Sequence, residues 1–151
     1  MSLEHVDDRD NGRYLKLFGF GVVLWLVPFL VSFLFYSPQG TPLVGVAFFN
    51  SIMSVALIVV ASVLLFLYFK QQTTDYMREA VKVGVVWILV SVVLDLVVLV
   101  PMAKMTIGQY ITDVALGYIV ILVIALLAGM LLEEKATHSK RIFSQVASTK
   151  K

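Results

Sequence analysis

The sequence predicts an all-α protein, an integral membrane antiparallel four-helix bundle with both termini in the cytoplasm. Its composition is the first observation behind this prediction. Of 151 residues, 60% are hydrophobic and 15% are charged, whereas soluble domains have about 45–50% apolar and about 25% charged residues. A chain this short cannot bury so much apolar surface away from water. A soluble domain and a disordered chain are therefore disfavoured, and a net charge of +2 gives no reason to expect a nucleic-acid partner.

The second observation is the spacing of apolar runs along the chain. A helix that crosses a bilayer needs about 20 mostly apolar residues. Four segments meet this length, and we expect membrane-spanning helices over about 17–36, 43–69, 77–103 and 107–132. The resulting membrane domain, 14–132, is preceded by a cytoplasmic segment, 1–13, and followed by a cytoplasmic tail, 133–151. The acidic leading segment and the long first run argue against a cleaved signal peptide.

The links between these runs are short, which favours antiparallel neighbours. Residues 37–42 contain two prolines and a glycine and are typical of a turn. Residues 71–75 offer polar N-caps, so the third helix is expected to begin near Tyr76. Thr106 and Gln109 have the spacing of a capping box at the start of the fourth helix.

The distribution of basic residues is the third observation, and it predicts the orientation. Of the 12 Lys and Arg residues, Lys104 alone lies in the third link, and the first link has none. The others lie in the N-terminal segment, the second link and the C-terminal tail. Because basic flanks stay on the cytoplasmic side, both termini are expected inside a plasma membrane.

Small residues are expected at the helix contacts, because spans associate in lipid through close backbone approach. The predicted packing positions are Ala47, Ala61, Gly84 and Gly117. Aromatic residues near the ends of spans match interfacial belts, and these are Tyr14, Tyr36, Tyr68 and Tyr76. Trp25 and Trp87 lie deeper and are interpreted as packing residues.

Two carboxylates inside the spans are the main chemical feature of the sequence. An ionised Asp in hydrocarbon costs about 2.5–3.5 kcal/mol on insertion scales, so such residues normally face the interior of a bundle. Asp95 and Asp113 are equally distant from the third link, so antiparallel helices would place them at a similar depth in the outer half. Facing each other, they would be expected to share one proton near neutral pH. The candidate ligand or proton site consists of Asp95, Asp113, Asn50, Ser54, Ser91 and Lys104.

A structural role for the same residues is the favoured interpretation. Asp113 could cap a shorter fourth span over 114–132 at the membrane surface. Asp95 could accept a hydrogen bond from Asn50 or from a tyrosine hydroxyl and so lock the bundle.

An enzyme is disfavoured by the residues available. The two histidines, His5 and His138, lie in the flanks. Neither aspartate belongs to the Tyr-Asp or Gly-x-Gly-Asp motif of intramembrane aspartyl proteases. We expect no metal site and no cofactor, and the chain has 0 cysteines.

The favoured function is a structural, lipid-associated or partner-binding component of the plasma membrane. Its expected partners are the lipid bilayer, a second copy of the chain or another membrane protein. The alternative is an oligomeric transporter or channel for protons, cations or a small polar ligand, which would use the outer-half site with Asp95 and Asp113.

The segment from Trp87 to Asp95, followed by Pro101, Tyr110 and Tyr118, resembles a group of uncharacterised four-span prokaryotic membrane proteins. In that group a Leu-Asp pair near the end of the third span precedes a fourth span that contains tyrosine. The group has no established activity, so the resemblance implies a four-helix membrane fold and no function.

Overall fold

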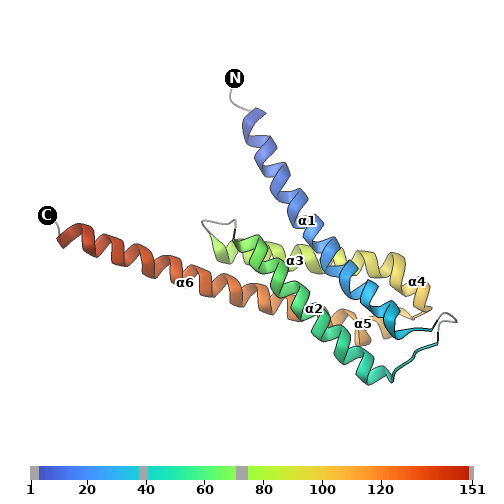
Figure 1. Ribbon diagram of the computed structural model, residues 1–151. Helices are drawn as coiled ribbons and strands as arrows, with labels where there is room; N and C mark the ends of the chain where they lie inside the picture. The colour runs from blue at the N-terminus through green and yellow to red at the C-terminus, as the bar shows by residue number, and fades with distance from the viewer. Residues whose placement is uncertain (1–3, 38–40, 71–74, 150–151) are drawn as a thin grey trace.

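The computed structural model describes residues 4–37, 41–70 and 75–149, and their regular structure is helical apart from one isolated bridge between Tyr36 and Pro42 (Figure 1). Four helical segments in these ranges are long and apolar enough to cross a membrane. They are Gly12–Phe35, Val46–Phe69, Tyr76–Ala103 and Ile107–Ile142. The predicted all-α, four-helix membrane fold is therefore confirmed.

The last two spans are each divided into shorter elements. In chain order the elements are α1 (Glu4–Ser32), the 3₁₀ turn η1 (Phe33–Phe35), α2 (Val46–Phe69), α3 (Tyr76–Leu94), the π-helical turn η2 (Asp95–Leu99), α4 (Val100–Ala103), α5 (Ile107–Asp113), the 3₁₀ turn η3 (Ala115–Tyr118) and α6 (Ile119–Thr149).

The first and last helices extend beyond the predicted spans. Helix α1 begins at Glu4, inside the segment 1–13, and α6 continues to Thr149, through most of the tail 133–151. Residues 133–149 contain neither glycine nor proline, so nothing in their sequence ends the helix at the membrane boundary. In Figure 1 these two extensions project from the same end of the body.

The four long helices pack in a ring, because α3 and α2 each lie against both α1 and α6. The most extensive contacts are those of α3. The α1–α2 and α4–α5 links lie at one end of the body, and the ends of α2 and α3 at Phe69 and Tyr76 lie at the other (Figure 1). This alternation gives the antiparallel arrangement that the short links predict.

The structure confirms the predicted start of α3 and the predicted start signal of the fourth span. Helix α3 begins at Tyr76, but the side chain of Asp75 makes no cap hydrogen bond, and residues 71–74 lie outside the described residues. At the start of α5 the Thr106 hydroxyl accepts the Gln109 amide at 3.3 Å, and Gln109 Oε1 accepts the Thr106 amide at 3.0 Å. This is the predicted capping box.

Helices α1 and α3 approach closely at Gly21. A Cβ atom at this glycine would lie 3.2 Å from Trp87 Cδ1 and 3.3 Å from Val90 Cβ. The Trp87 indole is fully buried beside it and donates to the Leu17 carbonyl at 3.0 Å. Trp87 is thus the packing residue that was predicted, and it also satisfies its own N–H inside the bundle.

Two of the four predicted packing positions are correct. Ala61 is fully buried, and Gly84 lies against Leu122, whose Cδ1 would be 2.7 Å from a Cβ at that glycine. Ala47 and Gly117 are both exposed, so neither is buried in a contact within the chain. Ala47 lies in the first turn of α2, and Gly117 belongs to η3, where the helix of the fourth span is interrupted.

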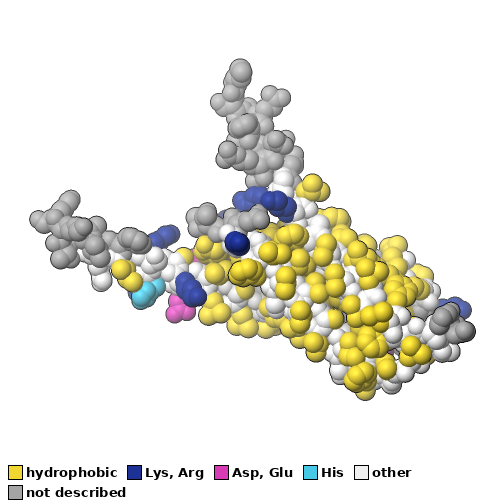
Figure 2. Space-filling view, in the orientation of Figure 1, with side chains coloured by type: hydrophobic (Ala, Val, Ile, Leu, Met, Phe, Trp, Pro, Cys, Tyr) yellow, Lys and Arg dark blue, Asp and Glu magenta, His cyan; other side chains and the backbone are white. Residues whose placement is uncertain are grey.

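The middle of the molecular surface is apolar. Figure 2 shows hydrophobic side chains over the body of the molecule, with Lys and Arg side chains gathered towards its ends. In the most apolar window of each span only 22–33% of the residues are buried. Water would not tolerate this much exposed apolar surface on a monomer, whereas lipid does.

Gly129 provides a test of the α3–α6 contact. A Cβ at this position would lie 2.6 Å from Ala80 Cβ and 3.1 Å from the Tyr76 carbonyl oxygen. We expect Gly129→Ala to lower the free energy of unfolding by about 1–3 kcal/mol, because backbone must move to admit the methyl group. The measurement is thermal unfolding in detergent followed by circular dichroism.

The matched control is Gly19→Ala in α1, where a Cβ meets nothing within 4 Å. This variant is expected to be neutral or more stable by about 0.5–1 kcal/mol, because alanine favours helix. Equal destabilisation by the two substitutions would contradict the contact.

Candidate functional site

Asp95 is the centre of a buried polar cluster towards the α4–α5 end of the bundle. Its side chain is 1% exposed. The Trp25 indole donates to Oδ1 at 2.7 Å, and the hydroxyls of Tyr118 and Tyr110 donate to Oδ2 at 2.6 and 3.1 Å. The three donors come from α1, α5 and η3, so one carboxylate joins the first, third and fourth spans.

A distortion of the third span coincides with this carboxylate. In η2 the Val100 amide donates to the Asp95 carbonyl, five residues back, instead of four. Pro101 follows directly, and its ring has no N–H and would crowd the carbonyl of Val97 in a regular α-helix. We attribute the wide turn to this proline. π-Helical turns of this kind occur frequently at functional sites.

A break in the fourth span brings the two tyrosines together. Val114 leaves the helical conformation, with φ −125° and ψ −59°, and separates α5 from η3. In an unbroken α-helix the Cα atoms of Tyr110 and Tyr118 would be about 12 Å apart along the axis. The break thus helps both hydroxyls to reach the same oxygen of Asp95.

The cluster satisfies its carboxylate without a cation. All three partners are donors, which suits a carboxylate that only accepts hydrogen bonds. Lys104 is exposed, in the left-handed conformation that ends α4, and it forms no ion pair among the described residues. Lys104 was predicted as a member of the same site as Asp95, but the exposed Lys104 is not part of this cluster.

The structure does not bring the two aspartates together. Asp113 is the last residue of α5, is exposed, and accepts a hydrogen bond from Thr112 Oγ1 at 2.9 Å. Its place just before the break at Val114 leaves it on the surface. The alternative interpretation placed Asp113 at the surface as a helix cap. Asp113 does lie at the surface, but it is the last residue of α5 and does not cap the next helix. The shared-proton geometry is not found.

The other members of the predicted polar layer also separate. Ser91 is fully buried one turn before Asp95, and its Oγ has no hydrogen-bond partner. Asn50 and Ser54 are exposed on α2, and the Ser54 hydroxyl donates to the Asn50 carbonyl of its own helix at 2.8 Å. Of the six predicted site residues, Asp95 and Ser91 alone are buried. The structural interpretation offered Asn50 or a tyrosine hydroxyl as the donor to Asp95, and the structure shows tyrosine hydroxyls.

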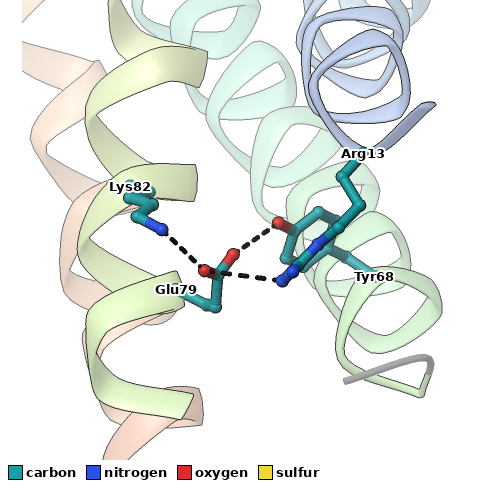
Figure 3. A network of polar contacts seen from close by, with 4 residues as sticks. All are labelled: Arg13, Tyr68, Glu79 and Lys82. Atoms are coloured by element: carbon teal, nitrogen blue, oxygen red, sulfur yellow. Dashed lines mark hydrogen bonds and ion pairs between the residues drawn. The ribbon is translucent and has the colours of Figure 1, made fainter. Parts of the chain in front are cut away.

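A second buried carboxylate, Glu79, lies at the opposite end of α3 (Figure 3). The Tyr68 hydroxyl donates to its Oε2 at 2.8 Å, and Lys82 Nζ lies 2.8 Å from its Oε1. Arg13 Nη2 approaches the same Oε1 at 3.6 Å. The Glu79 side chain is 10% exposed, whereas those of Arg13 and Lys82 are 53% and 47% exposed. This cluster joins α1, the C-terminal end of α2 and the N-terminal end of α3.

Several contacts of the Asp95 and Glu79 clusters were not predicted from the sequence. Trp25 was predicted to pack, and it is buried, but its bond to Asp95 was not foreseen. Tyr68 was assigned to an interfacial belt and is instead 7% exposed. The three-residue spacing of Glu79 and Lys82 on one helix was an available signal. Arg13 is too distant in sequence for any local pattern to reveal.

No family model, curated protein or solved structure matches the chain. The resemblance carried by residues 87–118 therefore stays a prediction. Within the described residues no group of three His, Cys, Asp or Glu side chains could hold a metal ion.

Tyr118→Phe tests the contribution of the Asp95 cluster to stability. A hydrogen bond to a charged group contributes about 1.5–3 kcal/mol, and we expect a loss of this size, because the Asp95 carboxylate has no water to replace the hydroxyl. The measurement is again thermal unfolding in detergent. Tyr36→Phe is the control, because Tyr36 is 43% exposed and its substitution should change stability by less than about 0.5 kcal/mol. Equal stabilities for the two variants would refute the role of the cluster.

Proposed function

We propose that this chain is a multi-pass plasma-membrane protein with both termini in the cytoplasm. In this proposal it carries out no reaction and works by binding lipid or membrane-protein partners through its helix surfaces. The observation that carries the proposal is that the carboxylate of Asp95 has hydrogen-bond donors on both of its oxygens. Three donors occupy its two oxygens and the side chain is 1% exposed, so the strongest polar group of the spans holds the bundle together.

The surface of the molecule supports a role in binding. Most residues of the spans face outward, and the two buried carboxylates are both engaged by side chains of neighbouring helices. Both histidines lie outside the apolar runs. The chemistry available in the spans is therefore that of contact surfaces.

The proposed orientation rests on the positions of the basic residues. Arg13 and Lys82 meet at Glu79, at the end of the body from which the terminal extensions of α1 and α6 project. Lys104 lies in the link at the other end. Cytoplasmic flanks are the basic ones, which supports placing Glu79 near the cytoplasmic boundary.

Cysteine labelling tests this orientation directly, because the chain has 0 cysteines of its own. Lys104→Cys is expected to react with a membrane-impermeant maleimide in intact cells. His138→Cys, an exposed position on α6, is expected to react only after permeabilisation. The reverse pattern would overturn the orientation.

An oligomeric transporter is the second candidate function. The observation in its favour is a buried intramembrane carboxylate next to a π-helical turn, with no basic partner among the described residues. Ionisable residues inside membranes are functional candidates by default. In this case Asp95 would carry a proton or bind a cation, and its three donors would have to release it during each cycle.

Proton flux in proteoliposomes separates the two candidates. With an imposed pH gradient and membrane potential, we expect the wild-type protein to admit protons no faster than protein-free liposomes. Asp95→Asn is expected to lower the unfolding temperature, because a carboxamide offers one acceptor oxygen where the carboxylate offers two. Asp113→Asn, on the exposed end of α5, should change neither quantity. Flux in the wild type that a folded Asp95→Asn variant lacks would establish the transporter instead.

A further inference from the structure

Helix α2 is fully buried only in its second half. Its buried residues are Ala61, Leu64, Leu65, Tyr68 and Phe69. Within 46–60 one side is partly covered, because Phe49 packs its ring against Phe35 and Tyr36, and Leu57 and Val60 pack against the core. In Figure 1 the Val46 end of α2 projects away from α3 and α6. The side of this half that carries Ala47, Asn50 and Ser54 is exposed.

The first half of α2 carries three polar side chains, those of Asn50, Ser51 and Ser54. The hydroxyls of Ser51 and Ser54 donate to the carbonyls of Ala47 and Asn50 in their own helix, at 2.9 and 2.8 Å. The Asn50 carboxamide is exposed, and no hydrogen bond is recorded for it. Asn50 is four residues inside α2, about 6 Å along the helix axis. An unpaired carboxamide at a lipid-facing position is costly, and bonding across helices relieves the cost.

The uncovered surface continues a stripe that packs elsewhere. Ala47, Ser54 and Ala61 follow one another at seven-residue spacing, so they lie on nearly the same side of α2. Ala61 is fully buried in the bundle, whereas Ala47 and Ser54 are exposed. The stripe therefore carries small residues, as helix contacts do, over its full length. Only its part at Ala61 is in contact with other helices of the chain.

We infer that the outer half of α2 binds the same surface of a second copy of this chain. A carboxamide both donates and accepts, so two Asn50 side chains related by a two-fold axis along the membrane normal can bond each other reciprocally. Ala47, Ser51 and Ser54 have small side chains, which allow the two backbones to approach. No charge would be buried, because residues 46–60 contain none.

The chain as a whole exposes more area than this contact would need. The chain exposes 10730 Å², whereas a compact monomer of 16.8 kDa is expected to expose about 7,700 Å². The excess is about 3,000 Å² per chain, part of which belongs to the terminal extensions of α1 and α6. A specific interface needs about 800 Å² from each partner.

Disulfide cross-linking in proteoliposomes tests the dimer, because the chain contributes no cysteine of its own. Ser54→Cys lies on the proposed surface. Val59→Cys is the matched control, since it is also exposed, at 55%, and lies about 140° around the helix. We expect oxidation to give a covalent dimer with Ser54→Cys and little with Val59→Cys.

Substitution of Asn50 in the Ser54→Cys background tests the hydrogen bond. Asn50→Ala is expected to weaken association roughly 3- to 30-fold, the range that interhelical polar contacts in membranes give. Asn50→Gln retains the donor and the acceptor and should recover part of the loss. The mass of the unmodified protein in nanodiscs or mild detergent gives an independent measurement, which we expect to correspond to two chains.

Equal cross-linking at both positions, or a monomeric mass in the unmodified protein, would overturn the inference. In the second case Asn50 would be left to water or lipid headgroups. The inference rests on the proposed role in partner binding, but the two fail separately. A monomer without proton flux refutes the dimer alone, and a dimer that conducts protons through Asp95 refutes the proposed function alone.

Discussion

The hydrogen bonding of one carboxylate organises the α4–α5 end of this protein. Asp95 is buried in a span, where no water is available to satisfy its oxygens. Its donors must come from other helices, and they come from α1, α5 and η3. The π-helical turn at Asp95 and the break at Val114 are both adjacent to this cluster. The irregular backbone of the spans therefore occurs where a polar group has to be reached.

The opposite end of α3 repeats the arrangement with a different chemistry. Glu79 is paired with two cations whose side chains remain half exposed. Asp95 is paired with neutral donors, which can be buried in the apolar interior at lower cost. The difference follows the solvent access of the partners. Between the two carboxylates, Gly84 lets α3 approach α6, and Gly21 of α1 lies against Trp87 and Val90 of α3.

The fold could be predicted almost completely from the sequence, and the site only in part. Long apolar runs and the positions of charges are local properties, and they were sufficient for the four spans and the capping box at Thr106. The pairing of Asp95 with Trp25 joins residues 70 positions apart, and no local pattern encodes it. Asp113 was predicted to lie beside Asp95 because the two are equally distant from the third link. This holds only if the fourth span is a continuous helix, and Val114 interrupts that helix.

Two indole bonds join α1 to α3, and they run in opposite directions. Trp25 donates from α1 to Asp95, and Trp87 donates from α3 to Leu17, each across 70 positions of the sequence. The equal offsets mean that the two helices run parallel, with the bonds eight residues, or about 12 Å, apart. Gly21 sits between them at the closest approach. Sliding of α1 along α3 would break both bonds together, so the two bonds jointly oppose piston motion between these spans.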